Sequence, residues 1–166
     1  MMILVPAGNG WMCESDPGEP GLGVKRWSIN DTEARLVSEL FRGLTVLEIG
    51  TGLGVSTRAI AKKANWVHTV DIDPWVAENV VLPPNVFFYR DIKDVPEGLD
   101  ATFIDGYHNR KQCIKDIRDA RRIVKPGGLI IFHDALMKPI HQAIIDSKIE
   151  CTLIHTVCGL AVGWIE

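Results

Sequence analysis

The chain has 166 residues, of which 46% are apolar and 23% charged, and these values are typical of one globular domain with a buried core. Its formal net charge is −3, so no overall positive field attracts it to nucleic acid or to an anionic membrane. No apolar run approaches the roughly 18 to 20 residues of a membrane span, and the N-terminus lacks the basic region of a signal peptide.

The cysteines are scattered and form no CxxC pair; they are Cys13, Cys113, Cys151 and Cys158. This distribution indicates reduced thiols and predicts a cytoplasmic protein. The spacing of Cys151, His155 and Cys158 does not predict zinc, because a fourth ligand is lacking and a strand would turn the two cysteines in opposite directions.

Residues 1–30 contain many Gly, Pro and charged residues, and we expect an irregular N-terminal arm or lid there. Residues 31–166 are expected to form a single domain. Its first helix is predicted at 30–43, with Asn30 or Asp31 as the cap and Gly43 after its end.

Strands and helices then alternate to the end of the chain. Strands are predicted at 45–50, 66–72, 85–91, 99–106, 129–134, 150–157 and 159–166. Helices are predicted at 56–65, 74–80, 109–125 and 138–149, the third of them broken by the Pro-Gly-Gly stretch at 126–128. This order predicts an α/β fold, a Rossmann-like, doubly wound sheet of seven strands that is mostly parallel and ends in an antiparallel hairpin.

Glycines stand at alternate positions after the first predicted strand, at Gly50, Gly52 and Gly54. Ligands in open α/β sheets bind at this edge, where backbone amides and a helix N-terminus come close together. The dinucleotide fingerprint G-x-G-x-x-G is missed, because its third glycine would stand at Val55. For the glycines alone, a tight turn without a ligand is the alternative.

Acidic residues end the second and third predicted strands, at Asp71 and Asp91. An acid about 20 residues after a glycine turn accepts hydrogen bonds from ribose hydroxyls. Together with the glycines, these two acids predict a ligand-binding edge.

The stretch E-x-G-x-G-x-G from Glu48 to Gly54, followed by the two acids, resembles the cofactor site of class I S-adenosylmethionine-dependent methyltransferases. The resemblance implies that Glu48 and the first glycines surround the methionine part of the cofactor, that Asp71 binds the ribose and that Asp91 approaches the adenine. The implied cofactor-binding set is Glu48, Gly50, Thr51, Gly52, Gly54, Ser56, Asp71, Ile72, Asp91, Ile92 and Asp105.

Two further stretches, FIDGYH at 103–108 and KPGGLIIFHD at 125–134, resemble a subgroup of these enzymes. The subgroup comprises small-molecule O-methyltransferases related to macrolide and sugar methyltransferases and to cephalosporin hydroxylase-like proteins. It implies a divalent cation on Asp105, His133 and Asp134. His133 departs from the carboxylate of metal-binding members, so Mg²⁺ and other divalent cations stay open.

Without a metal, His108 or His133 is expected to act as general base, so the predicted catalytic residues are Asp105, His108 and His133. The structural alternatives are that Asp105 caps the following helix and that His133 and Asp134 lock the last loop.

The expected activity is transfer of a methyl group from S-adenosylmethionine to an oxygen of a small molecule. The alternatives are an RNA or protein methyltransferase and a non-catalytic subunit that binds the cofactor. Basic residues on the helix at 109–125 are interspersed with acids, which favours a solvated face over a nucleic-acid surface. With few elements outside the sheet fold, the acceptor pocket is either open or completed by a second copy in a homodimer.

Overall fold

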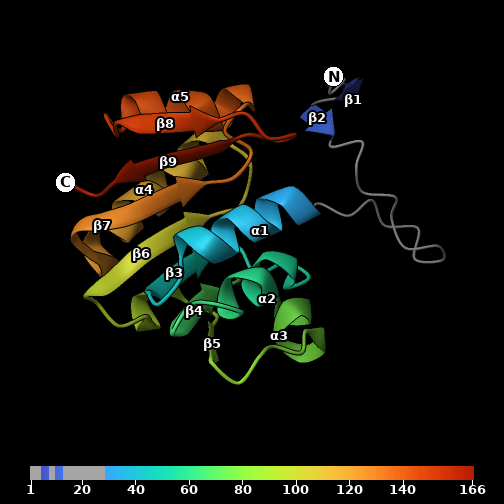
Figure 1. Ribbon diagram of the computed structural model, residues 1–166, viewed down its shortest axis with the longest axis vertical. Helices are drawn as coiled ribbons and strands as arrows, with labels where there is room; N and C mark the ends of the chain where they lie inside the picture. Colours follow the sequence, from blue (N-terminus) through green and yellow to red (C-terminus); the bar gives the residue numbers. More distant parts are fainter. Residues whose placement is uncertain (1–4, 8–9, 13–28) are drawn as a thin grey trace.

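The computed structural model describes residues 5–7, 10–12 and 29–166, and for the first two segments the backbone alone. A seven-stranded sheet dominates the described part, with the strand order β5-β4-β3-β6-β7-β9-β8 (Figure 1). The strands are β3 (Thr45–Ile49), β4 (Trp66–Val70), β5 (Val86–Tyr89), β6 (Leu99–Ile104), β7 (Val124–Phe132), β8 (Cys151–Ile154) and β9 (Leu160–Trp164).

The first five of these strands run parallel, whereas β9 is antiparallel to both β7 and β8. The helices are α1 (Asp31–Leu40), α2 (Val55–Ala61), α3 (Pro74–Asn79), α4 (Arg110–Ile123) and α5 (Lys138–Asp146), with the 3₁₀ turn η1 (Ile92–Asp94). The predicted α/β architecture with an antiparallel C-terminal hairpin is therefore confirmed.

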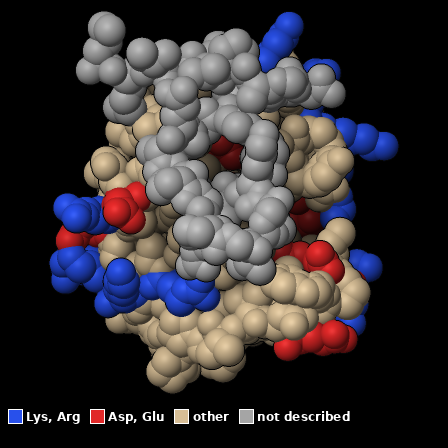
Figure 2. Space-filling view, turned by 90° about the vertical axis from the view of Figure 1, so that its right-hand side faces the viewer, with Lys and Arg blue, Asp and Glu red and all other residues tan. Residues whose placement is uncertain are grey.

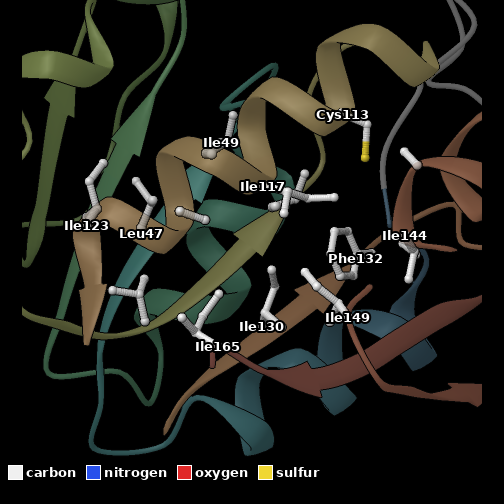
Figure 3. Close-up of a cluster of buried hydrophobic side chains, with 14 of the residues drawn as sticks. Leu47, Ile49, Cys113, Ile117, Ile123, Ile130, Phe132, Ile144, Ile149 and Ile165 are labelled. Carbon is white, nitrogen blue, oxygen red and sulfur yellow. The ribbon is translucent and has the colours of Figure 1, made fainter. Parts of the chain in front are cut away.

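Helices cover both faces of the sheet. On one face, α4 and α5 pack on apolar side chains of β3, β6 and β7, and Ile117 of α4 shares this cluster with Leu47 and Phe132 (Figure 3). On the other face, α1 and α2 bury Val37, Ile60 and other residues of a second cluster. Each fully buried large aliphatic or aromatic side chain contributes about 1.5 to 3 kcal/mol. The two clusters fix the sheet rigidly and so position the loops at its edge.

The start of α1 is set by a capping box. The side chain of Asn30 accepts hydrogen bonds from the backbone N–H groups of Thr32 and Glu33, and the Glu33 carboxylate accepts one from the Asn30 N–H. This arrangement satisfies N–H groups that have no partner within the helix. The predicted cap at Asn30 is confirmed, and Glu33 is turned inward.

The helix predicted to reach residue 125 ends two residues earlier, so this prediction was wrong at its end. Strand β7 begins at Val124 and runs through the Pro-Gly-Gly stretch, where its pairing with β6 shifts register. Gly127 has a φ of 75° and donates its N–H to the carbonyl of Ile165. A side chain at Gly128 would meet Val124 Cγ1 at 2.4 Å. The glycines therefore form a bulge inside the strand.

The arm predicted at 1–30 is not irregular throughout, because β1 (Val5–Ala7) and β2 (Gly10–Met12) pair as antiparallel strands. Most of the residues predicted to form an arm or lid lie outside the described residues, so this role stays a prediction. No helix of the described ranges combines the length and the apolar character needed to cross a membrane.

Candidate active site

The glycine turn after β3 packs directly against the end of β6. Gly50 has a φ of 100°, and a side chain there would lie 2.3 Å from the carbonyl oxygen of Asp105. Gly54 also has a positive φ, of 72°, and is the N-cap residue just before α2. At Gly52, by contrast, an added Cβ would meet nothing within 4 Å among the described residues. The turn therefore has one packed side and one open side.

Glu48 lies beneath this turn, fully buried in β3. Its Oε2 accepts hydrogen bonds from the hydroxyls of Thr57 at 2.5 Å and Thr69 at 2.6 Å, while Oε1 has no hydrogen-bond partner among the described residues. Burial raises the pKa of Glu48 to about 7, although hydroxyls led by that of Ser56 oppose the rise. Through these hydrogen bonds Glu48 links β3 to α2 and β4, the elements next to the turn.

Thr51 continues this network, since its Oγ1 lies 2.7 Å from Oγ1 of Thr69. Thr51 and Ser56 are both buried. Of the predicted cofactor residues at the turn, Thr51 and Ser56 are buried and support the backbone, whereas Gly52 faces open space.

Asp71 follows β4 and lies beside the open side of the turn. One carboxylate oxygen accepts the N–H of Gly52 and the other the N–H of Asp73, each at 2.9 Å. Ile72 is 82% exposed, which is unusual for an apolar side chain of this size. The structure therefore brings the predicted ribose-binding acid to the glycine turn.

Asp91 follows β5 and is exposed, and its carboxylate accepts the N–H of Lys93 at the start of η1. Ile92 is half-buried and packs against the α4-side core. The ends of β4 and β5 are joined by a hydrogen bond from the Asp71 N–H to the Tyr89 carbonyl. Asp91 therefore lies one strand beyond Asp71 along the same edge.

A cluster of charged side chains occupies the ends of β6 and β7. Nε2 of His108 lies 2.7 Å from Oδ2 of Asp134 and 3.6 Å from Oδ1 of Asp105. Nδ1 of His133 lies 3.0 Å from Oδ1 of Asp105 and 3.1 Å from Oδ2 of Asp134. The residues predicted for catalysis and for cation binding are thus brought together, with each aspartate in contact with both histidines.

These contacts raise the pKa of His108 to about 9, because Asp105 and Asp134 accept hydrogen bonds from its ring. Burial lowers the pKa of His133, but Asp105, by charge and hydrogen bonding, and Asp134 outweigh burial and hold it well above its usual value. For Asp134, hydrogen bonds from both histidines outweigh burial and lower its pKa. Charged imidazoles and carboxylates therefore stabilise one another here.

Asp134 adopts a left-handed backbone conformation with a φ of 53°. Aspartate tolerates this region better than most residues, at a cost of about 1 kcal/mol. The conformation turns the chain out of β7 and places Oδ2 between the two histidines.

Glu33 completes the cluster from α1 and was not predicted as a site residue. Its Oε2 lies 3.2 Å from Nε2 of His133, and its Oε1 accepts the hydroxyl of Thr156 and the N–H of Cys158. Burial raises the pKa of Glu33, but the hydrogen bond and the charge of His133 lead the effects that leave it lowered. The capping pattern N-x-x-E from Asn30 was the signal available in the sequence.

Among the described residues, two groups of side chains have ligand atoms close enough for a metal ion. One is Asp105, His108 and Asp134, and the other is Glu33, His133 and Cys158; within each, the atoms lie within 4.8 Å of one another. The predicted ligand set joined His133 to Asp105 and Asp134, whereas the first group contains His108 in that place. Asp105 does not cap the following helix, as one alternative had it, because Asn109 is the cap of α4.

Figure 2 shows the face on which the parallel strands end, with Lys and Arg side chains around its margin and acidic side chains between them. Arg110, at the start of α4, is paired with Asp146. Several Lys and Arg side chains lie next to one another at the lower left of this face in Figure 2.

The sheet order, the glycine turn and Asp71 define the class I S-adenosylmethionine-dependent methyltransferase fold. Residues 47–135 match the family model described as a methyltransferase domain, and the chain belongs to this family.

Solved structures share this fold at low sequence identity. An O-methyltransferase from Bacillus cereus in complex with SAH superposes with a TM-score of 0.70 at 18% identity, covering 84% of this chain and 83% of that one. An O-methyltransferase from Streptomyces achromogenes involved in tomaymycin synthesis, in complex with SAM, gives a TM-score of 0.68 at 16% identity, covering 83% and 81%.

A curated relative, a ribosomal RNA small subunit methyltransferase A of Pyrobaculum islandicum, is 38% identical over 72 residues, which are 39% of this chain. The chain spans 31% of the length of that relative.

Proposed function

We propose that this methyltransferase transfers a methyl group from S-adenosylmethionine to a hydroxyl oxygen of a small molecule. The observation that carries the proposal is the position of Asp105, which belongs to both halves of the edge. Its backbone carbonyl packs against Gly50 of the glycine turn, and its carboxylate contacts His133 and His108. A ligand at the turn and a hydroxyl at the histidines would therefore be neighbours.

The chain's residues fit the cofactor at the turn. The open side of Gly52 leaves room for a ligand, and each oxygen of Asp71 keeps a lone pair besides the one that accepts a backbone N–H. In the proposal Asp71 binds the ribose hydroxyls, exposed Ile72 and half-buried Ile92 flank the adenine, and Asp91 accepts from its amino group. Glu48 holds the turn in shape from below. When bound, the cofactor supplies a methyl group already activated by the sulfonium.

The acceptor hydroxyl has to lose a proton, and His108 is the residue placed to take it. Its side chain is 27% exposed, whereas that of His133 is 4% exposed. With a pKa of about 9, His108 holds a proton at neutral pH, so it acts as base only in its unprotonated fraction. Asp134 orients the ring through the 2.7 Å contact.

The same atoms also fit a divalent cation, because Asp105, His108 and Asp134 each offer one ligand atom within the 4.8 Å limit. A cation held there would lower the pKa of an acceptor hydroxyl. Base catalysis by His108 and cation-assisted ionisation are therefore both compatible with this geometry, and a chelator distinguishes them.

RNA methylation is the second candidate, supported by the similarity to the ribosomal RNA methyltransferase of Pyrobaculum islandicum. The net charge of −3 favours a small acceptor over a polyanion. A homodimer that completes the acceptor pocket is a further part of the proposal, and sedimentation of the purified chain tests it.

The function is tested with methyl-labelled S-adenosylmethionine, a panel of hydroxylated small molecules and ribosomal RNA, with and without chelator. We expect label in a small molecule, and a loss of about 100-fold or more in His108→Gln. His141→Gln, which changes an exposed histidine of α5, is the matched control and should keep full activity. Label in RNA alone, or cofactor binding without any transfer, contradicts the proposal.

A further inference from the structure

Glu33, His133 and Cys158 lie close together, although they come from three distant segments of the chain. Glu33 is in α1, His133 follows β7, and Cys158 lies in the loop between β8 and β9. Glu33 is fully buried, and its two oxygens face the Thr156 hydroxyl, the Cys158 N–H and Nε2 of His133. A buried carboxylate, an imidazole and a thiol thus meet at a single point.

The positions of these side chains are compatible with tetrahedral metal coordination. Glu33, His133 and Cys158 each offer one ligand atom, and these atoms lie within 4.8 Å of one another. Bonds of about 2.0 to 2.1 Å to nitrogen and oxygen, at tetrahedral angles, place those two atoms a little over 3 Å apart. The observed separation of His133 Nε2 and Glu33 Oε2 is 3.2 Å.

The other nitrogen of His133 supplies a second, independent observation. Nδ1 lies 3.0 Å from a carboxylate oxygen of Asp105 and 3.1 Å from one of Asp134. Metal-binding imidazoles commonly donate their second N–H to a carboxylate, which fixes the ring and the tautomer. With its proton on Nδ1, His133 presents the lone pair of Nε2 toward Glu33 and Cys158.

We propose that Glu33, His133 and Cys158 form a site for a thiophilic divalent cation, of which Zn²⁺ is the best match. Thiolate, imidazole and carboxylate are ligands of Zn²⁺, whereas Mg²⁺ takes oxygen ligands. The site differs from the oxygen-rich group of Asp105, His108 and Asp134 and does not depend on the proposed methyl transfer. It ties α1 and the β8–β9 loop to the end of β7.

Protons compete with the cation for the ligand atoms of Cys158 and His133. Burial raises the pKa of the Cys158 thiol to about 12, so without a cation the sulfur keeps its proton. Binding of the cation releases the thiol proton, and any proton on Nε2 of His133, to the solvent. The cation then takes over the positive charge between the carboxylates.

Cobalt(II) titration of the full chain, stripped of metal with chelator, tests the site. A Co²⁺ ion on Cys158 gives a thiolate-to-cobalt charge-transfer band in the near ultraviolet, together with visible bands of tetrahedral cobalt. We expect the band in the wild type and its loss in Cys158→Ser. We also expect Glu33→Gln to weaken cobalt binding by more than about 100-fold, beyond the usual effect of an outer-shell change.

The matched control replaces the other three cysteines, as Cys13→Ser, Cys113→Ala and Cys151→Ser combined, and should retain the band. Its persistence in Cys158→Ser, or cobalt binding without any thiolate band, overturns the proposal. Titration of S-adenosylhomocysteine into the same samples reports separately on the proposed function. Cys158→Ser changes a single atom, so a folded protein is expected for this comparison.

Discussion

The two halves of the functional edge are built by different means. At the glycine turn, residues close in sequence form the site, and backbone conformation and buried hydroxyls hold it. At the ends of β6 and β7, side chains as far apart in sequence as Glu33 and His133 meet, and charge holds them. The first half therefore depends on steric fit and the second on the ionisation of its members.

Replacement of Gly50 gives the largest expected effect. Gly50→Ala combines a positive φ with a Cβ at 2.3 Å from the Asp105 carbonyl, so we expect a loss of at least about 3 kcal/mol in the free energy of unfolding. Gly52→Ala is the matched control, with a φ of 49° but open space, and should cost about 1 kcal/mol. Urea unfolding measures both, and equal losses would contradict the packed turn.

Changes of pH should alter the stability of the two halves over different ranges, through Glu48 in the first and His108 in the second. The folded state holds a proton on Glu48, whose pKa rises from 4.5 to about 7, so Glu48 makes the protein less stable as the pH rises through this range. His108, with its pKa raised from 6.5 to about 9, contributes stability that is present below 6.5 and is lost as the pH rises through 9. Each contribution is at most about 3 kcal/mol.

The check is denaturant unfolding across this pH range in the presence of chelator. Glu48→Gln should remove the decline between pH 4.5 and 7, and His108→Gln the decline between 6.5 and 9. If both variants keep the wild-type pH dependence, the two ionisations are assigned to the wrong residues.

The first half was predictable because its residues are local. Strand, turn and acid follow one another, so Gly50, Asp71 and their neighbours could be placed from spacing alone. The buried position of Glu48 was not foreseen, since it depends on Thr69 of the adjacent strand.

The second half was predictable only in part. Asp105, His108, His133 and Asp134 come from two adjacent strand ends, so their meeting could be expected. Glu33 is 100 residues from His133, and only the packing of α1 on the sheet brings them together.

Removal of a donor to Glu33 should give an intermediate effect. Thr156→Val leaves the buried carboxylate with one hydrogen bond fewer, and we expect a loss of about 2 kcal/mol. Thr152→Val, at an exposed position of β8, is the control and should stay within about 0.5 kcal/mol of wild type. Thermal unfolding at constant pH compares the two, and a loss as small as that of the control would contradict the account of the Glu33 contacts.

The smallest expected effects come from the helix caps beside each half. Asn30→Ala removes the capping box of the ten-residue α1 and should cost about 1 kcal/mol. Asp73→Ala removes a single hydrogen bond, to the N–H of Trp75, at the shorter α3 and should cost less. Urea unfolding of both variants tests this order, and the reverse order would contradict it.

The most direct test of the central claim is calorimetric titration of S-adenosylhomocysteine into the wild type, Asp71→Ala and Asp94→Ala. Asp94 is an exposed acid of η1 and serves as the control. The account predicts wild-type binding that falls at least about tenfold in Asp71→Ala, since a hydrogen bond to a charged group contributes about 1.5 to 3 kcal/mol, and is unchanged in Asp94→Ala. Absence of binding to the wild type, or equal affinity in Asp71→Ala, would contradict it.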